Sequence, residues 1–356
     1  MLKIRELRVR AVRVPMPEPH RTASGMLTES PLVLTDVITE DGITGHSITF
    51  TYTVAALGPT AELIRNLEPL LKGEQAFPLD VERKLAARFR LLGTQGLVGL
   101  ALAAIDMALW DLQARSRNTS LARLLGAAEK PIRAYGAVGY DGPEGCARAA
   151  ENWARQGFQA VKAKIGYPSV QQDVDVIRAM RAAAGDIAIM VDYNQSLSPV
   201  EAVQRLRVLD EEALEWVEEP TLAHDYEGNA MVAREARTPI QCGENWWGTL
   251  DLRHAIQAGA SDLIMPEVMK MGGVSAWLRA AALAETHRIP ISNHLWPEIS
   301  AQLLCTTSMA HWLEFVDWWN AIVAQPLRIE RGMAITEGTV GSGVEWNEEA
   351  IIRCCA

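Results

Sequence analysis

Two patterns of hydrophobic and polar residues divide the chain. Over residues 1 to about 52, the segments "IRELRVRAVRV" and "PLVLTDVITEDGITGHSITF" alternate apolar and polar positions, which predicts half-buried β-strands, with a hairpin turn at Asp41-Gly42. The stretch between them, residues 17–30, is rich in Pro, Gly, Ser and Thr and predicts a mobile loop. Residues 54–126 have helical spacing, and "VGLALAAIDMALWDLQARS" predicts a buried helix.

From about residue 130, short apolar runs alternate with helical stretches such as residues 199–209. Eight runs begin 22 to 28 residues apart: "IRAYGAV", "AVKAKIG", "AIMVDYN", "LEWVEEP", "IQCGEN", "LIMPE", "IPISNHL" and "HWLEFVD". This alternation predicts an α/β fold in which eight parallel strands close into a TIM-type barrel. A doubly wound open sheet is the alternative, but no Gly-rich fingerprint follows the first strand. Residues from about 320 to 356 return to irregular or strand-like patterns.

Length, charge and cysteine content narrow the class of protein. A chain of 356 residues, 49% hydrophobic and 22% charged, is long enough for a large core and a smaller second unit. The net charge of -10 argues against binding to nucleic acid or to an anionic membrane surface. We expect no apolar run long enough to span a bilayer. The five cysteines form no metal-binding spacing, so we expect reduced thiols in a cytoplasmic protein.

Nearly every predicted strand ends in a polar or ionisable residue. In a barrel of this type, the carboxyl ends of the strands form the active face. From the second strand to the eighth, these residues are Lys162 and Lys164, Asp192 and Asn194, Glu218 and Glu219, Glu244 and Asn245, Glu267, His294 and Glu314. Seven consecutive strands with ionisable ends favour a functional site over solvated turns.

Three of these carboxylates suggest a metal site. Asp192, Glu218 and Glu244 follow one another at intervals of 26 residues on adjacent strands. Three carboxylates at one spot would repel one another without a cation. A set of oxygen ligands without His or Cys favours Mg²⁺ over Zn²⁺. The alternative is that each carboxylate caps the helix that follows it.

The remaining residues suggest acid and base catalysts. An ammonium screened from water beside a second ammonium and a cation loses proton affinity, so we expect Lys164 to act as a base. Lys162 would contact a substrate carboxylate; the alternative is that both lysines snorkel at a barrel rim. Glu267 is placed to fix the tautomer of His294, a second acid or base. We expect Glu314, without a charge partner, to be protonated and to donate a hydrogen bond to an oxyanion.

Several segments carry a resemblance to a known family. The chain resembles the mandelate racemase subgroup of the enolase superfamily, most strongly the racemase that gives the subgroup its name, in "VKAKIGYP", "MVDYNQSL", "WVEEPTLAHDYEG", "GENWWG", "MPEVMKMGGV", "SNHLWPEIS" and "AHWLE". The resemblance implies an α+β capping domain over residues 1–125, towards which residues 321–356 return, and a modified (β/α)7β barrel over residues 126–320. It also implies a Mg²⁺-stabilised enolate formed from a carboxylate substrate.

The resemblance leaves three functions open. Racemisation of mandelate or a related 2-hydroxy acid by a Lys/His base pair is the first. Dehydration of a polyhydroxy (sugar) acid by the same pair is the second. A metal-binding barrel without turnover is the third. Related cycloisomerases and dipeptide epimerases use a lysine at the sixth strand end, where this chain has Glu267, with Lys270 three residues later. A barrel of this kind with a capping domain is also expected to form a homo-oligomer.

The resemblance also implies a substrate pocket. Its residues would be Asn194, which by analogy touches the α-hydroxyl, together with His20, Ser24, Leu27, Tyr52 and Leu295. Two positions depart from the family pattern. The usual partner of the histidine is Asp, not Glu267. The capping loop offers His20, Arg21 and Ser24 beside Met26 and Leu27, which favours a more polar substrate than mandelate; the alternative is that these side chains point to solvent.

Overall fold

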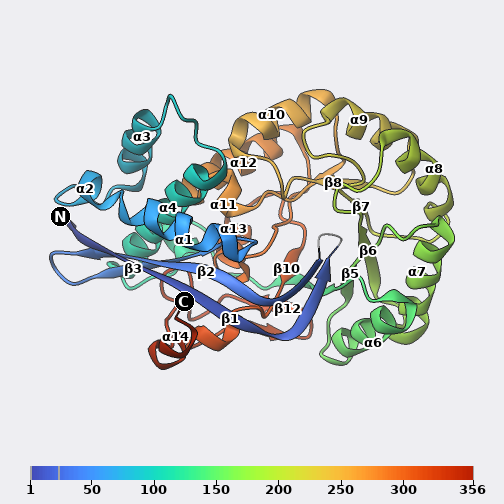
Figure 1. Cartoon of the computed structure of the whole chain (residues 1–356), viewed down its shortest axis with the longest axis horizontal. Coiled ribbons are helices and arrows are strands. Elements are labelled where there is room, and N and C mark those ends of the chain that lie inside the picture. Colours follow the sequence, from blue (N-terminus) through green and yellow to red (C-terminus); the bar gives the residue numbers. More distant parts are fainter. Residues whose placement is uncertain (1, 23–24, 356) are drawn as a thin grey trace.

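A three-stranded antiparallel sheet backed by helices forms the first part of the molecule (Figure 1). The structure is a computed structural model that describes residues 2–22 and 25–355. The strands are β1 (Ile4–Thr22), β2 (Gly25–Thr39) and β3 (Thr44–Phe50). The helices are α1 (Val54–Arg65), α2 (Glu68–Leu71), α3 (Pro78–Arg88), α4 (Gly96–Arg115) and α5 (Leu121–Leu124). The predicted meander followed by helices is therefore confirmed.

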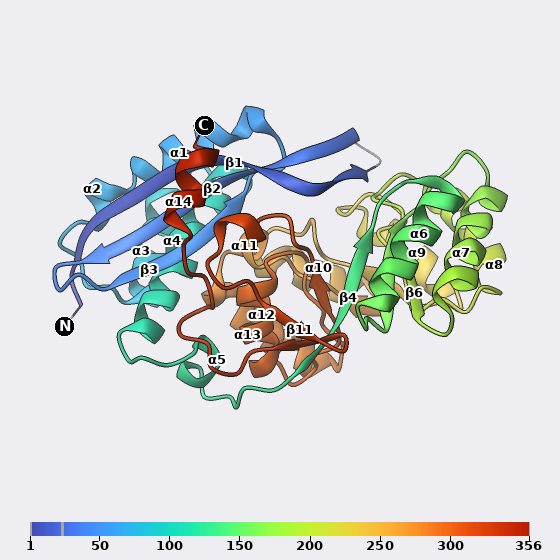
Figure 2. The ribbon, with the colours of Figure 1, turned by 90° about the horizontal axis from the view of Figure 1, so that it is seen from below.

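The predicted mobile loop over residues 17–30 is wrong. Strands β1 and β2 form one long hairpin through this region, with His20 paired to Leu27. Its prolines lie on β1, which is an edge strand, where a missing backbone N–H is tolerated. The pairing register shifts between Pro15 and His20. In Figure 2 the hairpin extends from the sheet towards the barrel, and the backbone N–H of Tyr140 donates to the carbonyl of Arg21 at 2.9 Å.

Helix α4 packs against the sheet and against the barrel. A Cβ atom on Gly45 of β3 would lie 2.1 Å from the carbonyl oxygen of Ala108, so only glycine allows this close approach. Contrary to expectation, α4 is long and apolar enough to cross a membrane, with 20 residues and a mean hydropathy of 1.5. However, 83% of its apolar window is buried inside the molecule, which identifies it as a core helix.

The second part of the molecule is a parallel barrel. Its strands are β4 (Ile132–Val138), β5 (Ala160–Lys164), β6 (Ala188–Asp192), β7 (Val217–Glu218), β8 (Ile240–Cys242), β9 (Leu263–Ile264) and β10 (Leu313–Phe315), which pairs with β4. The seventh predicted run forms only parallel bridges, from Ile291 to Ile264 and Ala310 and from His294 to Glu267. The predicted α/β barrel is confirmed, with a short irregular seventh strand.

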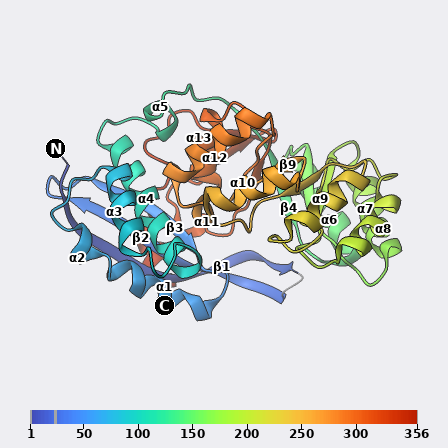
Figure 3. The same ribbon diagram turned by 90° about the horizontal axis from the view of Figure 1, so that it is seen from above.

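Helices surround the barrel (Figure 3). They are α6 (Gly142–Arg155), α7 (Val170–Ala184), α8 (Pro199–Leu209), α9 (Tyr226–Glu235), α10 (Gly248–Ala258), α11 (Val268–Met271), α12 (Val274–His287) and α13 (Pro297–Thr306). Their starts follow local sequence signals. Ser169 and Gln172 form a capping box before α7, and Ser198 caps α8, where Pro199 occupies the first helical position.

The C-terminal segment returns to the first domain. It contains a 3₁₀ helix η1 (Asn320–Ile322), strands β11 (Arg328–Glu330) and β12 (Met333–Ile335), and a helix that the sequence pattern missed, α14 (Glu348–Cys354). Strand β12 is antiparallel to β4, and α14 lies beside β1 (Figure 2). Arg10 of β1 contacts Glu348 at 2.5 Å. The exact division at residues 125 and 320 stays a prediction.

Candidate active site

Adjacent strands bring the predicted residues to one end of the barrel. In the parallel ladder, Lys164 of β5 is level with Asp192 of β6, and Asp192 is level with Glu218 of β7. Glu218 is level with Gln241 of β8, and Glu244 follows just past the end of that strand. Because parallel strands share one carboxyl edge, equal spacing along the chain becomes proximity in space.

The three predicted metal ligands form one cluster. Asp192, Glu218 and Glu244 are buried, and each offers an oxygen within 4.8 Å of the others. Burial raises the pKa of Glu218 well above its usual range, and the neighbouring carboxylates raise it further, although Lys162 opposes this. Three buried carboxylates with a common centre fit a hard divalent cation such as Mg²⁺, which would relieve their repulsion.

Neighbouring side chains orient these carboxylates. The backbone and side-chain amides of Asn194 donate to Asp192 at 2.6 and 3.0 Å. The indole of Trp216 donates to Glu218 at 3.1 Å, and Asn245 donates to Glu244 at 3.0 Å. Asn194, predicted as a substrate contact, is therefore also a partner of a metal ligand. Trp216 was missed, although its position two residues before Glu218 places both on the same strand face.

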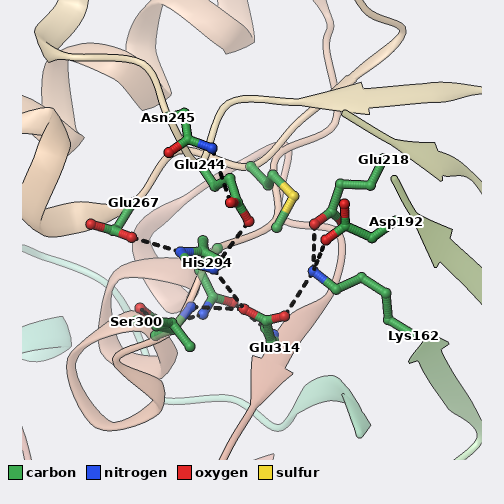
Figure 4. Close-up of polar contacts among 12 residues, drawn as sticks. Lys162, Asp192, Glu218, Glu244, Asn245, Glu267, His294, Ser300 and Glu314 are labelled. Atoms are coloured by element: carbon green, nitrogen blue, oxygen red, sulfur yellow. Dashed lines mark hydrogen bonds and ion pairs between the residues drawn. The ribbon is translucent and has the colours of Figure 1, made fainter. Parts of the chain in front are cut away.

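The two lysines contact this cluster directly. Lys162 is buried, and its Nζ lies 2.5 Å from Glu218 and 3.9 Å from Asp192. Lys164 makes an ion pair with Asp192. Figure 4 shows Lys162 beside Asp192 and Glu218, and His294 beside Glu244. Both lysines thus point into the cluster and not along a barrel rim.

The expected depression of the lysine pKa values is wrong for this structure. Burial lowers the pKa of Lys164, but Asp192 outweighs it, and the pKa is raised. The pKa of Lys162 is raised well above its usual range despite burial, chiefly by Glu218 and Glu314. The carboxylates that cause the increase include the metal ligands. A bound cation would offset the negative charge of these carboxylates. Burial and the neighbouring ammonium of Lys162 would then remain, and both lower the pKa of Lys164.

The predictions for Glu314 are wrong in this structure. It has a charge partner, because Lys162 Nζ lies 2.8 Å from its Oε1. Burial alone would raise the pKa of Glu314, but Lys162 and His294 outweigh burial and lower it to about 2. The carboxyl group is therefore ionised, not protonated. Strand β10 closes the barrel two strands away from β5, so a contact between Glu314 and Lys162 arises only from closure.

His294 lies between two carboxylates, as Figure 4 shows. Its Nδ1 contacts Glu267 at 2.6 Å and its Nε2 contacts Glu244 at 3.1 Å. Burial lowers the pKa of His294, but Glu244 and Glu314 outweigh it and raise the pKa, with a further contribution from Glu267. The predicted pairing of Glu267 with His294 is confirmed, and the longer side chain of Glu267 still reaches the ring.

Other predicted pocket residues have varied positions. His20 packs on Trp318 with ring centroids 4.9 Å apart, and burial, followed by the charge of Lys164, lowers its pKa to about 4. The backbone N–H of Leu295 donates to Glu314 at 2.9 Å. Leu27 packs against the main core. Ser24 lies outside the described residues.

The hydroxyl of Tyr52, predicted to bind substrate, donates to Glu267. Lys270, which was not predicted as a site residue, donates to Asn245 at 2.8 Å and lies 4.4 Å from the centroid of the Tyr52 ring. The sequence did contain a signal for Lys270: it lies three residues after Glu267, and a helix places residues at this spacing on one face.

Comparisons with known proteins cover almost the whole chain. Residues 4–126 match the model of the mandelate racemase / muconate lactonizing enzyme N-terminal domain. Residues 145–350 match the enolase C-terminal domain-like model. Both halves of the chain therefore match the same superfamily, and the predicted capping domain and barrel are confirmed as its fold.

Similar proteins carry out different reactions. The 3,6-anhydro-alpha-L-galactonate cycloisomerase of Streptomyces coelicolor is 28% identical, and the alignment covers 98% of this chain and 99% of the relative. The L-talarate/galactarate dehydratase of Salmonella typhimurium is 29% identical over 91% of this chain and 82% of the relative. A hydrophobic dipeptide epimerase of Enterococcus faecalis is 27% identical over 80% of each.

A solved structure extends the likeness over the full length. An enolase from Bradyrhizobium, complexed with magnesium and mandelic acid, is 41% identical, has a TM-score of 0.96 and covers 100% of this chain and 99% of its own. Its bound magnesium agrees with the carboxylate cluster found here. The chain thus belongs to the mandelate racemase subgroup of the enolase superfamily and is a magnesium-dependent enzyme.

Proposed function

We propose that this enzyme removes and returns the α-proton of a 2-hydroxy carboxylate, and that its reaction is the racemisation of mandelate or a related acid. One observation carries the proposal. Lys164 contacts Asp192, at one end of the row of metal ligands, and His294 contacts Glu244, at the other end. Two acid/base groups on either side of one metal site suit a reaction that inverts a carbon. The mandelic acid in the Bradyrhizobium structure supports this substrate class.

The chemistry requires stabilisation of negative charge. An α-proton of a carboxylate is very weakly acidic, and its removal places a second negative charge on the carboxylate oxygens. Mg²⁺ held by Asp192, Glu218 and Glu244 would supply positive charge to offset this. The buried ammonium of Lys162 supplies a second positive charge, which acts strongly because the site excludes water.

The two proposed bases divide the proton transfers. For one enantiomer, Lys164 Nζ takes the proton, the C–H electron pair enters the enolate, and His294 Nε2 donates a proton to the opposite face. For the other enantiomer the roles are reversed. Glu267 accepts from Nδ1 of His294, which leaves Nε2 directed towards the metal ligands.

Dehydration of a polyhydroxy acid is the second candidate. Buried His20, whose pKa responds to Lys164, adds a polar group beside the site, and the relatives include an acid-sugar dehydratase. In this reaction one base takes the α-proton, the other protonates the departing β-hydroxyl as water, and the enol becomes a 2-keto acid. A loss of mass equal to one water distinguishes the product from that of racemisation.

Exchange of the α-proton with solvent tests the proposal. Each enantiomer is incubated with Mg²⁺ in deuterated water and followed by proton NMR, first over a panel of aromatic 2-hydroxy acids and sugar acids. We expect Lys164→Ala to abolish exchange for one enantiomer and His294→Asn to abolish it for the other. The exposed residues Lys72 and His287 provide matched controls as Lys72→Ala and His287→Asn.

The outcomes separate the two candidate reactions. Exchange with inversion supports a racemase, and loss of water supports a dehydratase. Absence of both across the panel overturns the proposed substrate class. If exchange occurs but neither substitution changes it, the assignment of Lys164 and His294 as bases is wrong.

A further inference from the structure

Tyr52 lies where the capping domain meets the barrel. It follows β3 and precedes α1, and its φ of 59° is in the left-handed region, which is uncommon for a residue other than glycine. Its neighbours fix this conformation. Thr51 Oγ1 donates to the carbonyl of Pro31 at 3.0 Å, and the side chain of Thr53 caps α1. The backbone is thus held in a strained form that directs one side chain into the barrel mouth.

The hydroxyl of Tyr52 reaches the partner of the catalytic histidine. It donates to Oε2 of Glu267, the same oxygen that accepts from Nδ1 of His294. Within the described part of the chain, the other oxygen, Oε1, has no hydrogen-bond partner. Glu267 is completely buried, so water does not replace a lost donor. One oxygen with two donors therefore determines how the carboxylate is turned.

We propose that Tyr52 is a positioning residue for His294: through Glu267 it fixes the imidazole against the substrate carbon, and so links the capping domain to one of the two bases. This inference rests on the proposed two-base function. Tyr52 acts on the His294 side alone, because Lys164 is held by Asp192 and has no contact with Glu267 among the described residues.

Removing the hydroxyl isolates this role. The Tyr52 ring packs on Phe50, with centroids 4.8 Å apart, and covers Lys270. Tyr52→Phe keeps both ring contacts and removes only the donor to Glu267. The carboxylate then turns more freely, and the imidazole loses its fixed orientation. Misplacement of a catalytic group by about 1 Å costs about 100-fold in rate.

The experiment compares the two enantiomers of a substrate found by the panel. In Tyr52→Phe, we expect α-proton exchange initiated by His294 to fall about 10- to 100-fold, while exchange initiated by Lys164 changes by less than about twofold. Tyr226→Phe, on the outer helix α9, is the matched control and leaves both rates unchanged. Equal losses for both enantiomers, or no loss for either, overturn the proposal.

A second measurement does not need turnover. The Nδ1 proton of His294, held by Glu267, should give a downfield proton NMR resonance, to be assigned by its absence in His294→Asn. We expect this resonance to shift in Tyr52→Phe and to stay in place in Tyr226→Phe; an unchanged resonance overturns the proposal. If wild-type protein exchanges neither enantiomer, the proposed function fails, and the resonance alone decides whether Tyr52 positions His294.

Discussion

The contact between α4 and α12 gives a pH dependence that can be worked out from the structure. Asp106 of α4 is buried and accepts from the hydroxyl of Ser275 at 2.5 Å and from its backbone N–H at 3.0 Å. Trp110 donates to the same hydroxyl at 2.8 Å. Burial raises the pKa of Asp106 from 3.8 to about 7, although the bonds from Ser275 act downward. This carboxyl group therefore joins the capping domain to the barrel in its protonated form at mildly acidic pH.

The direction of the effect follows from proton binding. Between pH 3.8 and about 7, folded Asp106 holds a proton that the unfolded chain has lost. Its contribution to stability is complete at low pH and is lost as the pH rises to about 7. At about 1.4 kcal/mol for each pH unit, the total is about 4 kcal/mol, and the loss from pH 5 to pH 7 is about 2–3 kcal/mol.

The assay is urea unfolding of the wild-type protein and Asp106→Asn, with saturating Mg²⁺, at values from about pH 5 to about pH 8. Asn has the shape of the protonated acid but does not titrate. We expect the free energy of unfolding of the wild type to fall by about 2–3 kcal/mol relative to Asp106→Asn as the pH rises from 5 to 7. The exposed Asp175→Asn provides the control. Parallel curves for wild type and Asp106→Asn would refute the reasoning.

Three further predictions concern the metal site and the packing. Mg²⁺ at 100 times its Kd should stabilise the wild type by about 2.7 kcal/mol, measured by thermal unfolding with and without EDTA, and Glu218→Gln should remove this gain. Lys162→Met leaves the buried carboxylates of Glu218 and Glu314 without their ammonium partner, and should lower the free energy of urea unfolding, measured without Mg²⁺, by about 3–5 kcal/mol. If the substitution costs as much in the Glu218→Gln background, this pairing is contradicted. Gly45→Ala should destabilise by about 1–3 kcal/mol because its Cβ meets the backbone of α4, whereas Gly58→Ala, which meets open space on α1, should be stabilising.

The sequence was informative where the spacing of residues along the chain determines which side chains lie close together. Asp192, Glu218 and Glu244 could be grouped in advance because adjacent parallel strands end at the same edge, whatever the details of packing. The pairing of Glu267 with His294 followed from the same rule, since a backbone bridge joins the two residues. Helical spacing of apolar residues likewise predicted the helix over residues 199–209, which the structure shows as α8 (Pro199–Leu209).

The sequence was uninformative where distant segments decide the outcome. The Pro-rich stretch of β1 is ordered because β2 pairs with it, and local composition does not report that pairing. The charge of Glu314 depends on Lys162, which it meets only after the barrel closes. The contact between the Tyr52 hydroxyl and Glu267 depends on how the capping domain packs on the barrel. Packing between domains leaves no periodic pattern along the sequence.

Glu267 combines a contact that the sequence predicts with one that it does not. An aspartate, the usual residue of the family at this position, would place its carboxyl group about one methylene nearer to its own backbone. Here a bridge fixes the backbones of Glu267 and His294 side by side, and Oε2 of Glu267 contacts Nδ1 of His294 at 2.6 Å. The same oxygen accepts from the hydroxyl of Tyr52 and lies 3.7 Å from Lys270. One carboxylate oxygen of the barrel therefore contacts both His294 and a tyrosine of the capping domain, so its orientation depends on both domains.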